Sequence, residues 1–138
     1  MRAAMSVSVA LLLAGVLTGC GIFGGGRPKV PEGESWRDEV VAALEGTPGV
    51  TSVDVTVNDV DDGGGGKGPV VYGKFTVTGD AQAVVDDAMR RMSDVLGPDS
   101  NGVGLNLSIT SPEGTGQNPR EFGYGSARHG RALWEATH

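Results

Sequence analysis

The sequence predicts an α+β domain in which two helices pack on one face of a small, mainly antiparallel three-stranded sheet. Two segments repeat apolar residues at helical spacing, and three segments alternate apolar with polar residues as strands do. Their order along the chain is helix, strand, strand, helix, strand. Because the second helix links the second and third strands, a right-handed connection favours a third strand beside the first, in the strand order 2-1-3.

The first helix is expected to begin at Ser35, whose hydroxyl offers a cap, with the carboxylate of Asp38 three residues later. Gly46 and Pro48 end this helix, and Gly49 leads into the first strand. The apolar residues at helical spacing are Trp36, Val40, Ala43 and Leu44.

Each of the three strands is expected to have one apolar and one polar side. The apolar sides consist of Val53, Val55 and Val57, then Val71, Phe75 and Val77, then Val103, Leu105, Leu107 and Ile109. The polar sides consist of Asp54, Thr56 and Asn58, then Tyr72, Lys74 and Thr76, then Gly104, Asn106, Ser108 and Thr110. A Gly-rich loop from Asp59 to Pro69 is expected to join the first two strands into a hairpin.

The second helix is expected to be the longer one. Gly79-Asp80 caps its start, and Gly97-Pro98 ends it. A continuous apolar stripe predicts that one side of this helix is buried. The stripe consists of Ala81, Val84, Val85, Ala88, Met89, Met92, Val95 and Leu96.

The first twenty residues combine a positive end at Arg2, an apolar run from Met5 to Leu17 and the small residues Thr18 and Gly19. This is the pattern of a secretory signal peptide, and the run is shorter than the roughly 20 residues of a membrane-spanning helix. The only cysteine, Cys20, follows directly. The alternatives are an uncleaved anchor and a buried thiol, but the glycines and prolines after the cysteine do not suit a packed core.

The segment Leu17-Thr18-Gly19-Cys20 resembles the lipobox of bacterial lipoproteins. The resemblance implies a cut between Gly19 and Cys20, and acyl chains on Cys20 that hold the protein at the extracytoplasmic face of the cell membrane. Two or three such chains anchor durably, because each buried methylene contributes about 0.8 kcal/mol. The expected division is a signal peptide over 1–19, a lipidated flexible tether over 20–34, a domain over 35–111 and an extension over 112–138.

Composition limits the classes of function. The chain of 138 residues has a formal net charge of −6, which becomes −7 when Arg2 leaves with the leader. Proteins that bind duplex nucleic acid have the opposite balance, so we expect no nucleic-acid partner. The roughly one hundred residues after the tether suffice for one modest core.

We expect no catalytic activity and no cofactor or metal. Gly68 to Lys74 has the spacing of a phosphate-binding loop, but Phe75 stands where such a loop needs Ser or Thr, and the segment lies in a predicted strand. The two histidines, His129 and His138, both lie near the C-terminal end.

An acidic cluster at the end of the first strand raises the question of a cation. Asp59, Asp61 and Asp62 supply carboxylate oxygens. The calcium-loop pattern needs further ligands where Gly63 and Val70 stand, so we favour a solvated hairpin tip.

The extension over 112–138 gathers positive charge and aromatic rings in an otherwise acidic chain. The candidate interaction residues are Arg120, Phe122, Tyr124, Arg128, Arg131 and Trp134. Such a mixture suits anionic headgroups or a partner protein. The alternative, which we favour, is that the extension packs over an open edge or the uncovered face of the sheet, with a short helix within 126–137.

Between Trp36 and Ile109, a helix leads through Thr47 to Val55 into a strand, and a later strand ends at Thr78-Gly79-Asp80 before a second helix. This order resembles the BON-type module of bacterial envelope proteins. The resemblance implies association with phospholipid or attachment to the envelope. The loop from Asp59 to Pro69 is longer than the usual turn of that module.

Two classes of function follow. The first is a non-catalytic interaction module, tethered to the membrane and offering its sheet or its C-terminal surface to an envelope protein. The second is a small-ligand or lipid-binding domain, which requires a cavity on the order of 300 Å³ between helices and sheet. The scarcity of large side chains predicts a filled core and favours the first class.

Overall fold

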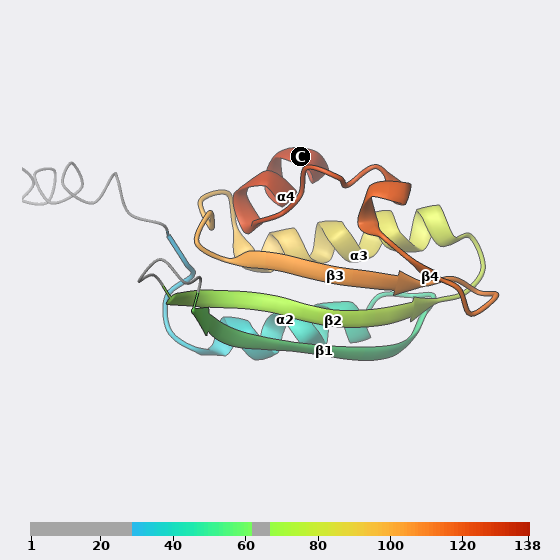
Figure 1. Cartoon of the computed structure of the whole chain (residues 1–138), viewed down its shortest axis with the longest axis horizontal. Helices are drawn as coiled ribbons and strands as arrows, with labels where there is room; N and C mark the ends of the chain where they lie inside the picture. Colours follow the sequence, from blue (N-terminus) through green and yellow to red (C-terminus); the bar gives the residue numbers. More distant parts are fainter. Residues whose placement is uncertain (1–28, 62–66) are drawn as a thin grey trace, which may run out of the picture.

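A computed structural model describes residues 29–61 and 67–138 (Figure 1). The leader, Cys20 and most of the expected tether lie outside these residues. The elements are helix α2 (Ser35–Glu45), strands β1 (Val50–Asp61) and β2 (Lys67–Val77), helix α3 (Ala81–Leu96), strands β3 (Gly104–Thr110) and β4 (Gly116–Gln117), a 3-10 helix (Pro119–Phe122) and helix α4 (Gly130–Thr137).

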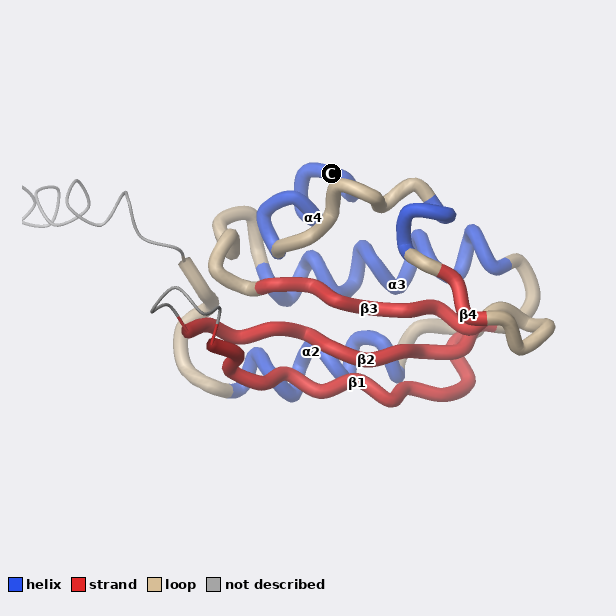
Figure 2. Tube along the Cα trace, in the orientation of Figure 1, coloured by secondary structure: helices blue, strands red, loops and turns tan. Residues whose placement is uncertain are grey.

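The described residues form two layers, a helical layer and a sheet (Figure 2). α3 lies in the middle of the helical layer and packs against α2 on one side and α4 on the other. α2 and α3 cover one face of the sheet, and the opposite face carries none of the described helices (Figures 1 and 2). The α+β class and the placement of two helices on one face are confirmed.

The sheet has the strand order β1-β2-β3-β4. β1 and β2 are antiparallel, β2 and β3 are parallel, and the short β4 is antiparallel to β3. The predicted order 2-1-3 is therefore wrong, and so is the expectation of three mainly antiparallel strands. The third strand lies beside the second, so the two form a parallel pair connected through α3.

Two physical reasons explain this strand order. β2 buries Val71, Phe75 and Val77 almost completely, which suits a central strand, whereas β1 carries Asp54 and Asp59, which suit an edge. In addition, the 16 residues of α3 span about 24 Å, long enough to return the chain to the starting end of β2. β2 and β3 can therefore pair directly, with no other strand between the two.

The predicted alternation of the strands is confirmed. Across the sheet, Val55 of β1 lies opposite Gly73 of β2, and Gly73 lies opposite Leu107 of β3. The apolar sides of the three strands therefore meet under the helices. The helices contribute Trp36, Val40, Leu44, Val85, Ala88, Met89, Met92 and Leu96 to the same core. All of these side chains are buried.

The helix ends agree with the sequence in part. Asp80 caps α3 by accepting a hydrogen bond from the Ala83 N–H at 3.2 Å, and Gly97 ends the helix with φ +82°, as predicted. Ser35 does not cap α2. It is the first helical residue, and the preceding Glu34 occupies the cap position without a side-chain hydrogen bond.

The C-terminal extension packs over the β3 edge and against α3. β4 pairs with Ile109 and Thr110, and the Leu105 N–H donates to the Arg128 carbonyl at 2.9 Å. α4 then begins at Gly130, where a Cβ would lie 2.6 Å from the Ser100 carbonyl oxygen. The extension therefore covers an edge of the sheet and leaves the opposite face open. A helix in this segment is confirmed, over Gly130–Thr137.

Gly73 permits the close approach of β1 to β2. Its φ is +142°, and a Cβ at this position would lie 2.1 Å from the Asp54 carbonyl oxygen. We expect Gly73→Ala to lower the free energy of unfolding by about 3 kcal/mol or more, because backbone strain and overlap add. Urea unfolding of the purified protein measures the change.

Gly79→Ala is the matched control for this substitution. Gly79 also has a positive φ, +73°, but the space around it is open. Gly79→Ala should lower the free energy of unfolding by only about 1–2 kcal/mol. Equal losses in the two variants would show that the close approach at Gly73 does not matter.

Candidate functional site

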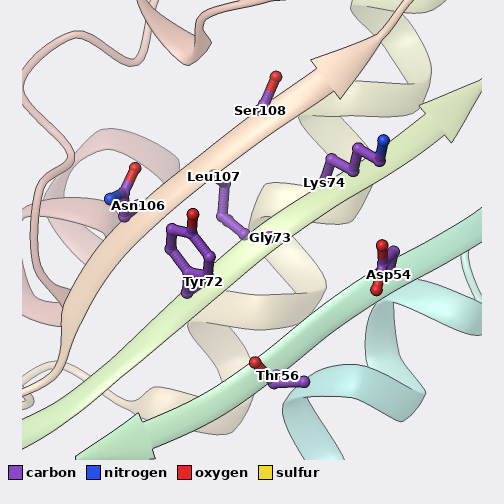
Figure 3. A pocket seen from close by; sticks show the side chains of 8 residues that line it. All are labelled: Asp54, Thr56, Tyr72, Gly73, Lys74, Asn106, Leu107 and Ser108. Carbon is purple, nitrogen blue, oxygen red and sulfur yellow. The ribbon is translucent and has the colours of Figure 1, made fainter. Parts of the chain in front are cut away.

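The open face of the sheet presents a row of polar side chains around one exposed aromatic ring. Register aligns Asp54 with Lys74 and Lys74 with Ser108, and in the next row Thr56 with Tyr72 and Tyr72 with Asn106. We call these six residues the Tyr72 face. Figure 3 shows these polar side chains and the tyrosine ring on the side of the strands away from the helices.

Tyr72 is the most exposed large apolar residue of the described chain. Its side chain is 58% exposed, although it lies in the central strand. A shallow hollow of about 390 Å³ lies beside the ring, and Gly73 and Leu107 complete its lining. The hollow is open to solvent and is not an enclosed pocket.

The chemistry of the Tyr72 face suits recognition of another surface. Tyrosine combines a large rigid apolar area with a hydroxyl, and it is enriched at protein interfaces. Around it lie one carboxylate, one ammonium group, one amide and two hydroxyls. Asp54 and Lys74 are cross-strand partners, so charge of neither sign dominates.

The structure also places parts of the acidic cluster and the segment with phosphate-loop spacing. No group of three His, Cys, Asp or Glu side chains within 29–61 and 67–138 could hold a metal ion. Asp59, a member of the predicted acidic cluster, forms an ion pair with Arg37 at 3.1 Å, and Asp62 lies outside the described part. Gly68 to Lys74 lies in β2, as predicted. None of the described helices has the length and apolarity to span a membrane.

The aromatic residues of the predicted C-terminal surface serve packing. Tyr124 is buried, and its hydroxyl donates to an Asp86 carboxylate oxygen at 2.6 Å. Phe122 is partly buried and packs against the core. Trp134 stacks on His138, with ring centroids 3.6 Å apart. These contacts attach the extension to α3 and to its own last turn.

The three arginines of that predicted surface are exposed but do not form one patch. Arg120 and Arg128 line a polar hollow of about 320 Å³ beside β3, together with Asn106 and Asn118. Arg131 lies on α4 and pairs with Glu135 at 3.4 Å. The structure therefore divides the six predicted residues between packing and two separate surfaces.

Sequence reasoning placed the residues of the Tyr72 face on polar sides of strands but did not single them out. A signal was present. Tyr72 is the one large aromatic residue on the predicted polar side of a strand, where its neighbours Lys74 and Thr76 are polar. The side chains that surround Tyr72 could not be predicted, because they depend on the strand order.

No protein-family model, curated protein or solved structure matches this chain. The candidate site therefore rests on its own geometry.

The hydrogen bond from Tyr124 to Asp86 generates a prediction about stability. Tyr124→Phe keeps the buried ring but removes the charge-assisted bond, so we expect the free energy of unfolding to fall by about 1–2 kcal/mol. Tyr72→Phe, which removes an exposed hydroxyl, should change it by less than about 0.5 kcal/mol. Urea unfolding of both variants measures the difference.

The same bond gives a pH dependence. Burial raises the pKa of Tyr124 above its usual value near 10, and the hydrogen bond and negative charge of Asp86 raise it further. Above about pH 10 the unfolded chain loses this proton while the folded chain keeps it, so stability falls as the pH rises. Wild type should lose more stability than Tyr124→Phe between about pH 9 and pH 11. Parallel pH curves for the two proteins would contradict this assignment.

Proposed function

We propose that this protein is a non-catalytic interaction module of the bacterial cell envelope, held at the membrane by lipid on Cys20, and that the Tyr72 face contacts a partner protein there. The observation that carries the proposal is the exposed Tyr72 ring at the centre of an uncovered polar sheet face. Tyrosine is enriched at the centre of protein interfaces, because its ring supplies rigid apolar contact area and its hydroxyl supplies a hydrogen bond.

The position of the N-terminal segment supports this arrangement. The Lys29 N–H donates to the Asn101 side chain at 2.8 Å, and the Lys29 carbonyl accepts from the Gly102 N–H at 2.7 Å. The described chain thus enters at the end of the sheet where β3 begins (Figure 1). Because Lys29 is bonded to the domain, the free part of the expected tether would run from Cys20 to Lys29 and would span roughly 16 Å on average. The Tyr72 face can therefore turn sideways to the membrane and remain accessible.

Two resemblances add to the proposal. The lipobox-like Leu17-Thr18-Gly19-Cys20 supports a lipid anchor. The element order α2, β1, β2, α3, β3 is the order in which the sequence resembles the BON-type module, and that resemblance favours an envelope role. Both remain proposals.

The ligand-binding alternative finds less support. The side chains between helices and sheet are close to fully buried, among them Val40, Phe75, Met92 and Ile109. The three hollows described, of about 320 to 520 Å³, all open at the surface. None of these three hollows is enclosed between the helices and the sheet, where the ligand-binding alternative places its site.

The interaction surface can be tested by capture in intact cells. A photoreactive phenylalanine analogue replacing Tyr72 should crosslink to a defined envelope protein, whereas the same analogue at the exposed Arg90 of α3 should not. Once the partner is identified, Tyr72→Ala should weaken binding by about tenfold or more, because exposed aromatic residues dominate interfaces. The free energy of unfolding of the Tyr72→Ala protein should fall by only about 1 kcal/mol, through lost strand propensity and cross-strand contact. Unchanged affinity would refute the role of this ring.

Anchoring has a separate test. Cys20→Ala removes the sulfur that would carry the lipid, so most of the protein should move from the membrane to the soluble fraction. Cell fractionation measures this, and mass spectrometry of the native protein should show the added mass of acyl chains on Cys20. Membrane retention of a Cys20→Ala chain whose leader has been removed would contradict acylation.

A further inference from the structure

A second surface lies between α2 and the outer edge of β1. It is a groove of about 520 Å³, and its lining includes Val41 of α2 and Val55 and Val57 of β1. We propose that this groove binds an extended segment of the partner protein, which adds as a further strand to β1. The inference rests on the proposed interaction function and names how the partner would attach.

The backbone of β1 is available for such pairing. Among the described residues β1 pairs only with β2, so its outer edge has no neighbouring strand. An unpaired edge of 12 residues presents a row of N–H and C=O groups that another chain can use.

The hydrogen bonds of β3 identify the outward groups. Leu105 donates to the Arg128 carbonyl, so its backbone points away from β2, and Asn106, the next residue, points toward β2. Asn106 is the register partner of Tyr72. In a parallel pair, the backbone N–H and C=O of Asn106 bond to the two residues on either side of Tyr72, which are Val71 and Gly73.

The backbone groups of Tyr72 and Lys74 therefore face β1 and pair with Thr56 and Asp54. By alternation, the N–H and C=O groups of Val53, Val55 and Val57 point to the free edge.

Side chains of an added strand would alternate between two environments. On one side they enter the groove beside Val41 and Val57, which are only half-buried, and find apolar contact. On the other side they lie next to Asp54 and Thr56, so the new strand would extend the Tyr72 face. One partner segment could therefore use both surfaces.

Charge selects the occupant. Asp38 and Glu45 of α2 line the groove on either side of Val41, while Arg37 is already paired with Glu34 and Asp59. Asp38 and Glu45 are seven positions apart, which is about 10 Å along the helix axis. This is close to the roughly 13 Å between groove-facing residues i and i+4 of a strand. The groove therefore fits a segment with basic, apolar and basic side chains at alternate positions.

A second copy of this chain fits the groove poorly. The chain carries a net charge of −6, and pairing β1 with another β1 would bring further aspartates beside an acidic groove. Like charges placed opposite one another destabilise a strand pair. A basic partner segment is therefore the better match.

The test uses the purified mature chain and a blocked peptide, Thr-Lys-Thr-Val-Thr-Lys-Thr. We expect saturable shifts of the amide NMR signals of Val53, Val55 and Val57 and slower hydrogen exchange at those amides. The same peptide N-methylated at its pairing residues should not bind. Asp38→Lys with Glu45→Lys should weaken binding about tenfold, while Asp99→Lys with Glu113→Lys, the matched change of net charge on exposed loops, should not.

The opposing outcomes are distinct. Unmoved β1 amides, shifts confined to the Tyr72 face, equal binding by both charge variants, or a doubled mass in sedimentation without peptide would each overturn the inference. Crosslinking from position 72 reports the proposed function separately. If that capture succeeds while the peptide fails to bind, the interaction function stands and strand addition does not.

Discussion

The central position of β2 is the constraint on which the rest of the structure depends. Its apolar side packs Val71, Phe75 and Val77 beneath the helices, with β1 on one edge and β3 on the other. Burial of such side chains is the main favourable term in folding. It requires neighbours on both edges of β2, and Gly73 permits one of them to approach, because any side chain there would collide with the Asp54 carbonyl.

The placement of β2 also determines what is left exposed. With all the described helices on one side, the residues that alternate with the buried ones must face solvent, and Tyr72 is the largest of them. With β3 occupying the other edge of β2, β1 becomes the outer strand beside α2. The Tyr72 face and the groove along β1 are thus two consequences of one packing arrangement, and they adjoin at Thr56, which lines both.

The C-terminal extension completes the domain on the opposite side. It pairs with the β3 edge, buries Leu133 and Tyr124, and holds α4 against α3 through the Ser93 and Thr137 hydroxyls, 2.8 Å apart. Within the described residues, one edge of the sheet is thereby largely covered by the chain itself, while the β1 edge is not. The extension thus serves to cover the β3 edge, whereas its arginines and aromatic residues alone had suggested an interaction surface.

The sequence by itself determined the type of nearly every element and which side of each strand is buried, and it also contains the lipobox-like segment. These are local properties, because they depend on the spacing of apolar residues, on helix caps and on the positions of glycine and proline. The strand order, the parallel pairing of β2 with β3 and the surroundings of Tyr72 were decided only by the tertiary structure. Alternation within β1, β2 and β3 fits either order equally well. Choosing between them depends on which strand can be buried on both edges, and that is a property of the whole packed domain.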